Sequence, residues 1–450
     1  MPAAAPGEAA EGQPQAQSAC HVDQTTNARC IEGSLGDSTP YRFVVPRGWN
    51  GTVVVSLDFA SRDLDEPFTQ RLLRRGFAVG GTTRDITGWR IGAAVHNQLA
   101  ALQKFTTAFG EPRWAIASGS SMGGMVAAMT AQEYPKRFDA AVPFCGGLGG
   151  AVGQWNQKLD TVFTLKTLLF PESELPVTDI PADVAGAQRA WRSALAEAQT
   201  TPEGRARIAL AASIGQLPSW GRTADGETTP KPDPGDAAAM QKGMYLALSG
   251  GTLPYIGQAM SSRRAIEQLA GGNPSWNTGV DYAKQFAAAD ESQRRAVRTL
   301  YRRAGLDLRS DLDALAEAPR IAADSAAVEY LEQSAVFNGD LQVPVLTVNP
   351  IGDQISTVAQ QQAYGAVVRS SGNARMLRQA YLRTVGHCAF NTAEREAAIT
   401  VIMHRLRTGR WSGFASPRML NHLTELAPGP GSGRYISYRP PRFNRPYFTE

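Results

Sequence analysis

One serine in this chain stands where the local sequence could make it a nucleophile. Ser121 lies in the run Gly119-Ser-Ser-Met-Gly123, which follows an apolar stretch at 114–117 and precedes an Ala- and Met-rich stretch at 125–132. The first stretch is typical of a buried strand, and the second of a helix. A serine on a sharp turn between a strand and a helix presents its hydroxyl for attack on a carbonyl carbon. The pattern therefore predicts a nucleophilic serine.

Glycines flank this serine because a tight turn leaves little room for side chains. Gly119 and Gly123 stand two residues before and two residues after Ser121, where side chains would collide with the neighbouring strand and helix. Gly124 is expected to relax the same crowding. A Gly-x-Ser-x-Gly match alone is a weak signal, so the flanking strand and helix carry most of the prediction.

A serine hydroxyl also needs a base, and the base needs a group that orients it. His387 is the expected base, because it stands in a turn between an apolar run at 377–385 and a helical pattern that begins near 391. Its ring would accept the hydroxyl proton of Ser121. The remaining histidines precede the serine or lie in a helical pattern or the C-terminal tail: His21, His96, His404 and His422.

The expected orienting acid is Asp353, which follows the strand-like run 343–349 almost at once. A carboxylate in that loop can hold the outer nitrogen of the histidine, which fixes its tautomer and stabilises the imidazolium. Asp340 is the competing acid, but it precedes the strand and would lie at the wrong end of a sheet. A turn-forming role is the ordinary alternative for Asp353.

These motifs resemble the α/β-hydrolase superfamily. After the serine come a helix, a Tyr134-Pro135 turn and a strand-like run at 140–145, and the order serine, acid, histidine is that of the superfamily. Strands alternating with helices from residue 41 onward independently predict an α/β fold with a mostly parallel, doubly wound sheet, whose catalytic groups lie at the carboxyl ends of the strands. The resemblance covers both ends of the chain but not its middle.

The resemblance implies an oxyanion hole made of two backbone N–H groups. Met122 is the expected first donor, and Phe59 or Ala60, after an early strand, the second. Many members carry His-Gly there, so Asp58 is a departure, since a carboxylate opposes the developing charge unless it points away or is paired. It could bind a hydroxyl or amine of the substrate, or hydrogen-bond its own loop, which is the more ordinary role.

The cysteines divide into two pairs by position. Cys20 and Cys30 flank a short polar loop and could close a disulfide, which would imply an oxidising compartment. In the superfamily's sheet order, Cys145 and Cys388 can approach each other, and a bridge would pin the loop of His387; two buried thiols are the alternative. Tannases and feruloyl esterases, which the chain partly resembles, tether a cysteine beside the histidine to one beside the serine, where this chain has Ser120.

The domain organisation follows from composition and the break in strand–helix alternation. With 450 residues, 43% of them hydrophobic, the chain is long enough for one large domain with an insertion or for two domains. We expect a disordered segment at 1–19, an α/β-hydrolase core at 20–145 and 341–410, an Ala-rich helical cap or lid at 146–340, and an irregular C-terminal tail at 411–450.

Charge and hydropathy restrict the partners. The net charge is +4 without dense basic runs, so nucleic acid is not an expected partner, and no apolar stretch reaches 18 residues, so no membrane span is expected. No signal peptide is visible, but the N-terminal segment fits a mature start after signal removal, which favours a secreted or extracytoplasmic location. No metal-ligand cluster or nucleotide loop is found, so no cofactor and no metal are expected.

The function expected from these residues is hydrolysis of a small-molecule carboxylic ester through an acyl-enzyme on Ser121. The same residues would serve a peptidase that releases short peptides, or an acyltransferase or cyclase that tailors a secondary metabolite. A non-catalytic binding protein on a hydrolase fold is the alternative from another class. The serine, histidine and acid argue against it, and Asp58 is its only support.

Overall fold

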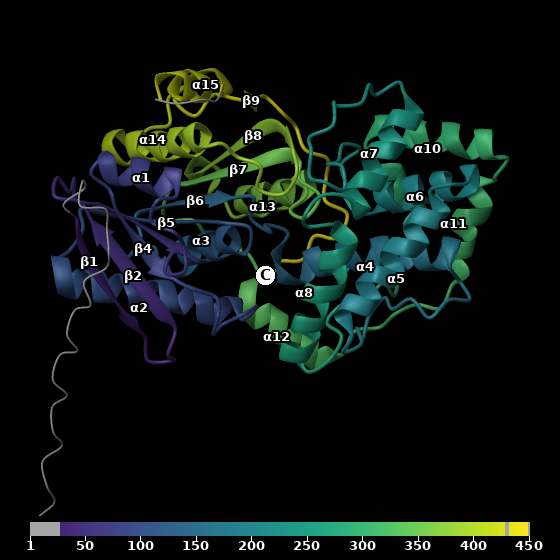
Figure 1. Ribbon diagram of the computed structural model, residues 1–450, viewed down its shortest axis with the longest axis horizontal. Helices are drawn as coiled ribbons and strands as arrows, with labels where there is room; N and C mark the ends of the chain where they lie inside the picture. Colours follow the sequence, from purple (N-terminus) through teal and green to yellow (C-terminus); the bar gives the residue numbers. More distant parts are fainter. Residues whose placement is uncertain (1–27, 428–431, 449–450) are drawn as a thin grey trace, which may run out of the picture.

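Alternating strands and helices fold into one sheet with helices on both faces. The computed structural model describes residues 28–427 and 432–448, and Figure 1 shows the sheet between its helical layers. The strand order is β1-β2-β4-β3-β5-β6-β7-β8-β9, with β3 to β8 parallel and β1, β2 and β9 antiparallel. The first eight strands have the order of the α/β-hydrolase fold, which confirms the expected fold class. The strands are β1 (Arg29–Ser34), β2 (Pro40–Val45), β3 (Thr52–Leu57), β4 (Ala78–Thr82), β5 (Trp114–Ser120), β6 (Ala140–Phe144), β7 (Val345–Gly352), β8 (Leu377–Val385) and β9 (Tyr435–Ile436).

Neighbouring residues of the central strands are buried on opposite faces of the sheet. Val54 belongs to the apolar cluster formed with α1 and α14, whereas Val53 and Val55 belong to the cluster formed with α2, α3 and α13. Because both faces are covered, the inner strands are continuous hydrophobic runs rather than alternating ones. The covering helices are α1 (Pro67–Arg74), α2 (Ile91–Phe109), α3 (Met122–Glu133), α13 (Val358–Ser370) and α14 (Thr392–Thr408).

A large helical segment, here residues 150–335, separates β6 from β7. It occupies the right side of Figure 1 in teal and green and has an apolar core of its own, which includes Trp191, Leu210 and Tyr301. The first turns of α4 and the helix α12 pack instead on the sheet-side core, through Trp155 and Leu331. Its helices are α4 (Gly150–Leu169), α5 (Val184–Ala198), α6 (Pro202–Ile214), α7 (Ala237–Ser249), α8 (Tyr255–Ala270), α9 (Tyr282–Ala288), α10 (Glu291–Ala304), α11 (Leu308–Glu317) and α12 (Ser325–Ala335).

The C-terminal part differs from the irregular tail that the sequence predicts. Residues Pro417–Leu426 form α15, which begins with a Ser416 side-chain cap and a proline in its first turn, and β9 extends the sheet beside β8. These elements were missed because α15 has ten residues and β9 two, too short for a periodicity to stand out.

A strap then closes the described chain, here residues 437–448. It runs, yellow in Figure 1, from β9 along the boundary between the sheet and the helical segment. Arg445 of the strap binds Asp160 of α4 at 2.8 and 2.9 Å, and Phe443 donates its N–H to the side chain of Gln362 on α13 at 3.0 Å. The strap therefore joins the two parts of the molecule.

No described helix is long and apolar enough to cross a membrane. The segment 1–19, expected to be disordered, lies outside the described residues.

Candidate active site

The expected nucleophile occupies the turn between β5 and α3. Ser121 has φ 59° and ψ −122°, a conformation that residues with a side chain rarely adopt. A Cβ atom on Gly119 would lie 2.5 Å from the carbonyl oxygen of Gly123, so glycine is required there. A Cβ on Gly123 would make only an ordinary contact, 3.5 Å from Leu57, whereas one on Gly124 would lie 2.6 Å from the Phe144 oxygen. The second crowded glycine is thus Gly124, not Gly123 as expected.

The structure brings the three expected catalytic side chains together from the ends of three strands. The Nε2 atom of His387 lies 2.7 Å from Oγ of Ser121, and its Nδ1 atom lies 3.0 and 2.9 Å from the two carboxylate oxygens of Asp353. The side chain of Asp353 is fully buried and that of His387 is 10% exposed. The competing acid Asp340 is exposed and precedes β7.

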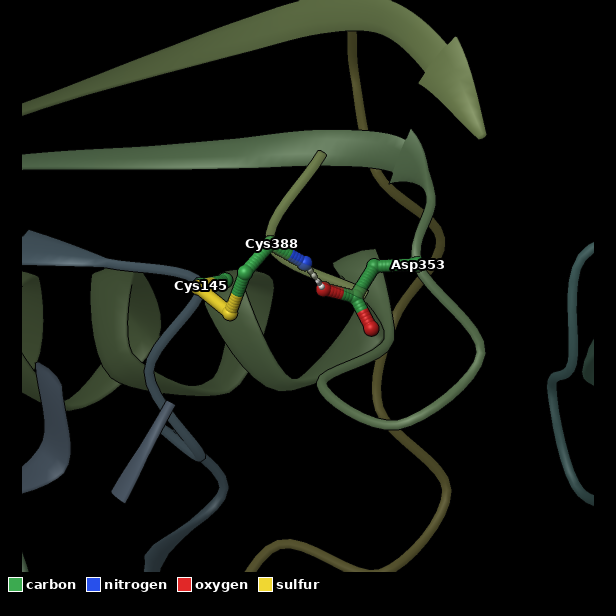
Figure 2. A group of neighbouring side chains, drawn as sticks. All are labelled: Cys145, Asp353 and Cys388. Atoms are coloured by element: carbon green, nitrogen blue, oxygen red, sulfur yellow. Dashed lines mark hydrogen bonds between the residues drawn. A yellow bond between two sulfur atoms is a disulfide. The ribbon is translucent and has the colours of Figure 1, made fainter. Parts of the chain in front are cut away.

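The loop after β7 holds the carboxylate of Asp353 in place. Its Oδ1 atom accepts the N–H groups of Ile355 and Ser356, both at 2.9 Å, and its Oδ2 atom accepts the N–H group of Cys388 at 3.2 Å, the bond dashed in Figure 2. The carboxylate is thus satisfied without solvent and can present its oxygens to His387 in one orientation.

A disulfide between Cys145 and Cys388 joins the end of β6 to the loop of the histidine (Figure 2). The Sγ atom of Cys145 lies 3.3 Å from the backbone nitrogen of Ser121, and that of Cys388 lies 3.4 Å from Nε2 of His387. The bridge therefore contacts both the nucleophile turn and the base. The expected bridge from Cys20 to Cys30 has Cys20 outside the described residues.

The disulfide also decides how a nearby cluster is interpreted. One sulfur of each bridged cysteine and a carboxylate oxygen of Asp353 lie within 4.8 Å of one another, a spacing that could hold a metal ion. Both sulfurs are committed to the S–S bond and the carboxylate to His387, so this cluster is not a metal site.

Unusual backbone conformations gather at the carboxyl edge of the sheet. Asp58, Ser121, Cys145 and Cys388 follow β3, β5, β6 and β8, and their φ angles are 66°, 59°, 44° and 54°. A residue with a side chain costs roughly 1–2 kcal/mol in this left-handed region. Such residues persist where the surrounding structure holds them, typically at functional sites.

Of the oxyanion donors expected from the sequence, Met122 directly follows Ser121, and Phe59 and Ala60 follow β3. Met122 is the first residue of α3, so its N–H group has no partner one helical turn earlier. Of the two candidates after β3, Ala60 donates its N–H group to the carbonyl of Thr82 at 3.3 Å.

Arg84, which the sequence analysis missed, accounts for Asp58. Its Nε atom lies 2.8 and 3.0 Å from the two carboxylate oxygens, and a second guanidinium nitrogen completes a bidentate pair. Its Nη1 atom lies 3.3 Å from the sulfur of Met122. The carboxylate of Asp58 is therefore paired with a cation, so it no longer opposes the negative charge that develops at an oxyanion site.

Arg434 supports the histidine loop from the C-terminal side. Its guanidinium binds the buried carboxylate of Glu394 at 2.8 and 2.7 Å and donates to the Ala389 carbonyl at 3.0 Å. Glu394 also forms a capping box with Asn391 at the start of α14. The residues that directly follow His387 are thus held by the disulfide at Cys388 and by the hydrogen bond from Arg434 to Ala389.

A cavity of about 260 Å³ lies between the helical segment, the loop after β7 and the strap. Its lining includes Trp220, Met240, Asp353 and Tyr438 but neither Ser121 nor His387. It therefore reaches the acid rather than the nucleophile, and we do not assign it to the acyl group.

Comparison with known proteins places the chain among hydrolases. Residues 36–380 match the tannase-like family of unknown function DUF6351. A curated relative, the o-phthalyl amidase of Xanthobacter agilis, is 33% identical over 452 residues, covering 93% of this chain and 96% of the relative.

Solved structures with some likeness are esterases. The rice cell wall degrading esterase LipA from Xanthomonas oryzae has 11% identity and a TM-score of 0.36, covering 86% of this chain and 89% of its own. The Pyrococcus furiosus esterase Pf2001 has 11% identity and a TM-score of 0.37, covering 85% and 92%. At these scores the assignment of the fold rests on the strand order, not on the likeness.

Proposed function

This chain belongs to the tannase-like family of unknown function DUF6351, and from that premise we propose that it is a serine hydrolase that transfers an acyl group from an ester or an amide to water. The observation that carries the proposal is the continuous chain of short contacts from Ser121 through His387 to Asp353. Family membership and the amidase relative support hydrolase activity.

The proposed mechanism passes through an acyl-enzyme. Oγ of Ser121 attacks the substrate carbonyl carbon while Nε2 of His387 takes the hydroxyl proton. The N–H groups of Met122 and Phe59 stabilise the oxyanion, and the leaving alcohol or amine departs with the proton from His387. A water molecule, deprotonated by the same imidazole, then attacks the acyl carbon, and the carboxylic acid is released. Asp353 stabilises the imidazolium in both steps.

The leaving group is the finer part of the proposal. The family is described as tannase-like, and carboxylic esters, which the sequence predicts as substrates, are the first compounds to test. The relative that matches nearly the whole chain is named an amidase that acts on o-phthalyl groups. We therefore include aromatic amides as the second candidate substrates, on the same serine.

The helical segment is proposed to cap this site. Arg222 donates to the Val385 carbonyl at 3.0 Å, two residues before His387, and the side chain of Gln354 donates to the Leu253 carbonyl at 2.9 Å. Residues 222–253 thus touch the loops of the base and of the acid. A cap in this position limits which acyl groups reach Ser121.

The disulfide is compatible with folding in an oxidising compartment, so we propose an extracytoplasmic location. Thiol alkylation of the protein in fractionated cells checks this, and free thiols at Cys145 and Cys388 would contradict it.

Parallel assays test the proposed function. p-Nitrophenyl esters from acetate to palmitate and the o-phthalyl amide of p-nitroaniline would be offered to the wild type, to Ser121→Ala and to Ser120→Ala. We expect turnover of at least one class that falls by about 10⁴-fold or more in Ser121→Ala. The neighbouring Ser120→Ala is the matched control and retains activity. Turnover that survives Ser121→Ala would refute the serine mechanism.

A further inference from the structure

One lysine is buried near the proposed catalytic acid with no partner for its ammonium group. Lys158 of α4 is 1% exposed, and among the described residues its Nζ atom has no hydrogen-bond partner. The rings of Trp155 and Tyr255 lie 5.1 and 5.3 Å from Nζ, at distances typical of cation–π contacts. Lysine is almost never fully buried unless it is paired, so this arrangement calls for an explanation.

The groups around Lys158 leave it short of negative charge. Burial and the nearby Arg263 lower the pKa of Lys158 to about 7, although Asp353 raises it. Arg263 is itself buried, over the Trp155 ring, and its nearest carboxylate is Glu267 at 3.8 Å. Asp353 is committed to His387. A lysine and an arginine therefore flank one tryptophan, and no described carboxylate bonds to Lys158.

We propose that Lys158 binds a carboxylate carried by an aromatic acyl group whose scissile carbonyl lies at Ser121. The inference rests on the proposed function and names its substrate class: esters or amides of an aromatic dicarboxylic acid. A carboxylate supplies the missing partner of the ammonium, and the aromatic acyl group is that of the candidate amides in the proposed function.

The position of Lys158 is consistent with one ligand that contacts both its ammonium group and the hydroxyl of Ser121. The adjacent Gln157 donates to the side chain of Thr357 in the loop that carries Asp353, and Asp353 is hydrogen-bonded to the histidine that contacts Ser121. Trp155 also meets Trp89 edge-on, with ring centroids 5.9 Å apart, and Trp89 lies in the loop that carries Arg84. The ammonium and the nucleophile thus share one neighbourhood, as two ends of a small ligand require.

A binding experiment tests this without catalysis. Ser121→Ala protein would be titrated calorimetrically with 2-carboxybenzamide and with benzamide, which differ by the one carboxylate. We expect 2-carboxybenzamide to bind at least about tenfold more tightly, as a charge-assisted contact implies, and the preference to vanish when Lys158→Met is added. Lys166→Met is the matched control on the same helix, because its Nζ atom bonds to the carbonyls of Phe170 and Pro171.

Proton uptake gives a second readout that a structural role would not produce. A bound carboxylate raises the pKa of Lys158 from about 7, so binding at pH 8 takes up a proton. The other titratable groups near Lys158 are Arg263, Asp353 with its partner His387, and Tyr255. Burial raises the pKa of the Tyr255 phenol, so that group stays protonated. The binding enthalpy at pH 8 should therefore depend on the buffer's ionisation enthalpy, and should cease to do so in Lys158→Met.

The outcomes separate this inference from the proposed function. A tenfold preference that persists in Lys158→Met overturns the role of Lys158, whatever Ser121 does. If Ser121→Ala protein binds neither compound, the role of Lys158 is also overturned. The nucleophilic role of Ser121 is tested separately, by the activity assays. Methionine replaces the unpaired buried ammonium group at similar volume, so the variant should melt no lower than its parent. If Lys158→Met does not fold, Lys158→Gln is used instead, and it too should lose the preference for 2-carboxybenzamide.

Discussion

The carboxylate of Asp353 does two jobs that a single substitution can separate. It accepts backbone N–H groups from Ile355 and Ser356, which shape its loop, and it faces Nδ1 of His387. An asparagine keeps an oxygen for the loop but no charge for the imidazolium. We expect Asp353→Asn to fold and to lose about 10³- to 10⁴-fold in kcat, measured by steady-state kinetics.

The control for Asp353→Asn is Asp340→Asn. This was the competing acid in the sequence, and it is exposed ahead of β7. Its variant should keep wild-type kcat. An Asp353→Asn enzyme within tenfold of the wild type would exclude the orienting role.

At this scale the sequence predicts residues that follow strands and misses those whose partners come from elsewhere. Ser121, Asp353 and His387 could be named because each directly follows an apolar run that had to be a strand. Arg84 could not, because its pairing with Asp58 depends on β3 and β4 lying side by side. Lys158 was hidden for the same reason, since nothing in α4 reveals what packs around it.

The disulfide links the end of β6 to the loop after β8 and so holds His387, the proposed base, in place. Cys145 and Cys388 are 243 residues apart in the chain, so the bridge closes a long loop and restricts the unfolded state. We expect the Cys145→Ala, Cys388→Ala double variant to lose about 2–5 kcal/mol of unfolding free energy and to fall in kcat more than it rises in KM. Urea unfolding and steady-state kinetics measure the two effects.

Reducing agent supplies the control for the disulfide. The wild type should lose activity in dithiothreitol, and the activity of the double variant should not respond. A wild type that is unaffected after its thiols are shown to be free would contradict the positioning role of the bridge.

Helices and strands could be predicted where their apolar runs were long. The prediction failed where an element was short or depended on tertiary contacts. The alternation of strands and helices expected from residue 41 onward is found, for example, in β2, β3 and α2. β1 was missed because one of its six residues is buried, so it carries little apolar pattern. The two residues of β9 pair with Tyr381 and Leu382 of β8, a tertiary contact that a two-residue pattern cannot indicate.

The whole molecule depends on the strap that joins the sheet to the helical segment. Arg445 binds Asp160, which is 1% exposed and also accepts from Tyr282 and Gln285. Removal of the arginine leaves a buried carboxylate without its cation. We expect Arg445→Met to lose about 3–5 kcal/mol of unfolding free energy at pH 8, measured with urea.

The pH dependence identifies the cause of this loss. Burial raises the pKa of Asp160, and Arg445 opposes that shift. Without Arg445 the folded state holds the proton more tightly than the unfolded state, so the variant's stability falls as pH rises above the ordinary range of a carboxyl group. The difference from the wild type should therefore shrink from pH 8 to pH 5. The exposed Arg439→Met is the control, and a loss that is the same at both pH values would refute the buried-charge explanation.

The nucleophilic character of Ser121 is the claim on which the proposed function depends, and labelling with a fluorophosphonate measures it directly. We predict one adduct by intact-protein mass spectrometry, mapped to the peptide that contains Ser121, absent in Ser121→Ala and formed at least about 10³-fold more slowly in His387→Ala. An unlabelled wild type, or an adduct that persists in Ser121→Ala, would contradict the account.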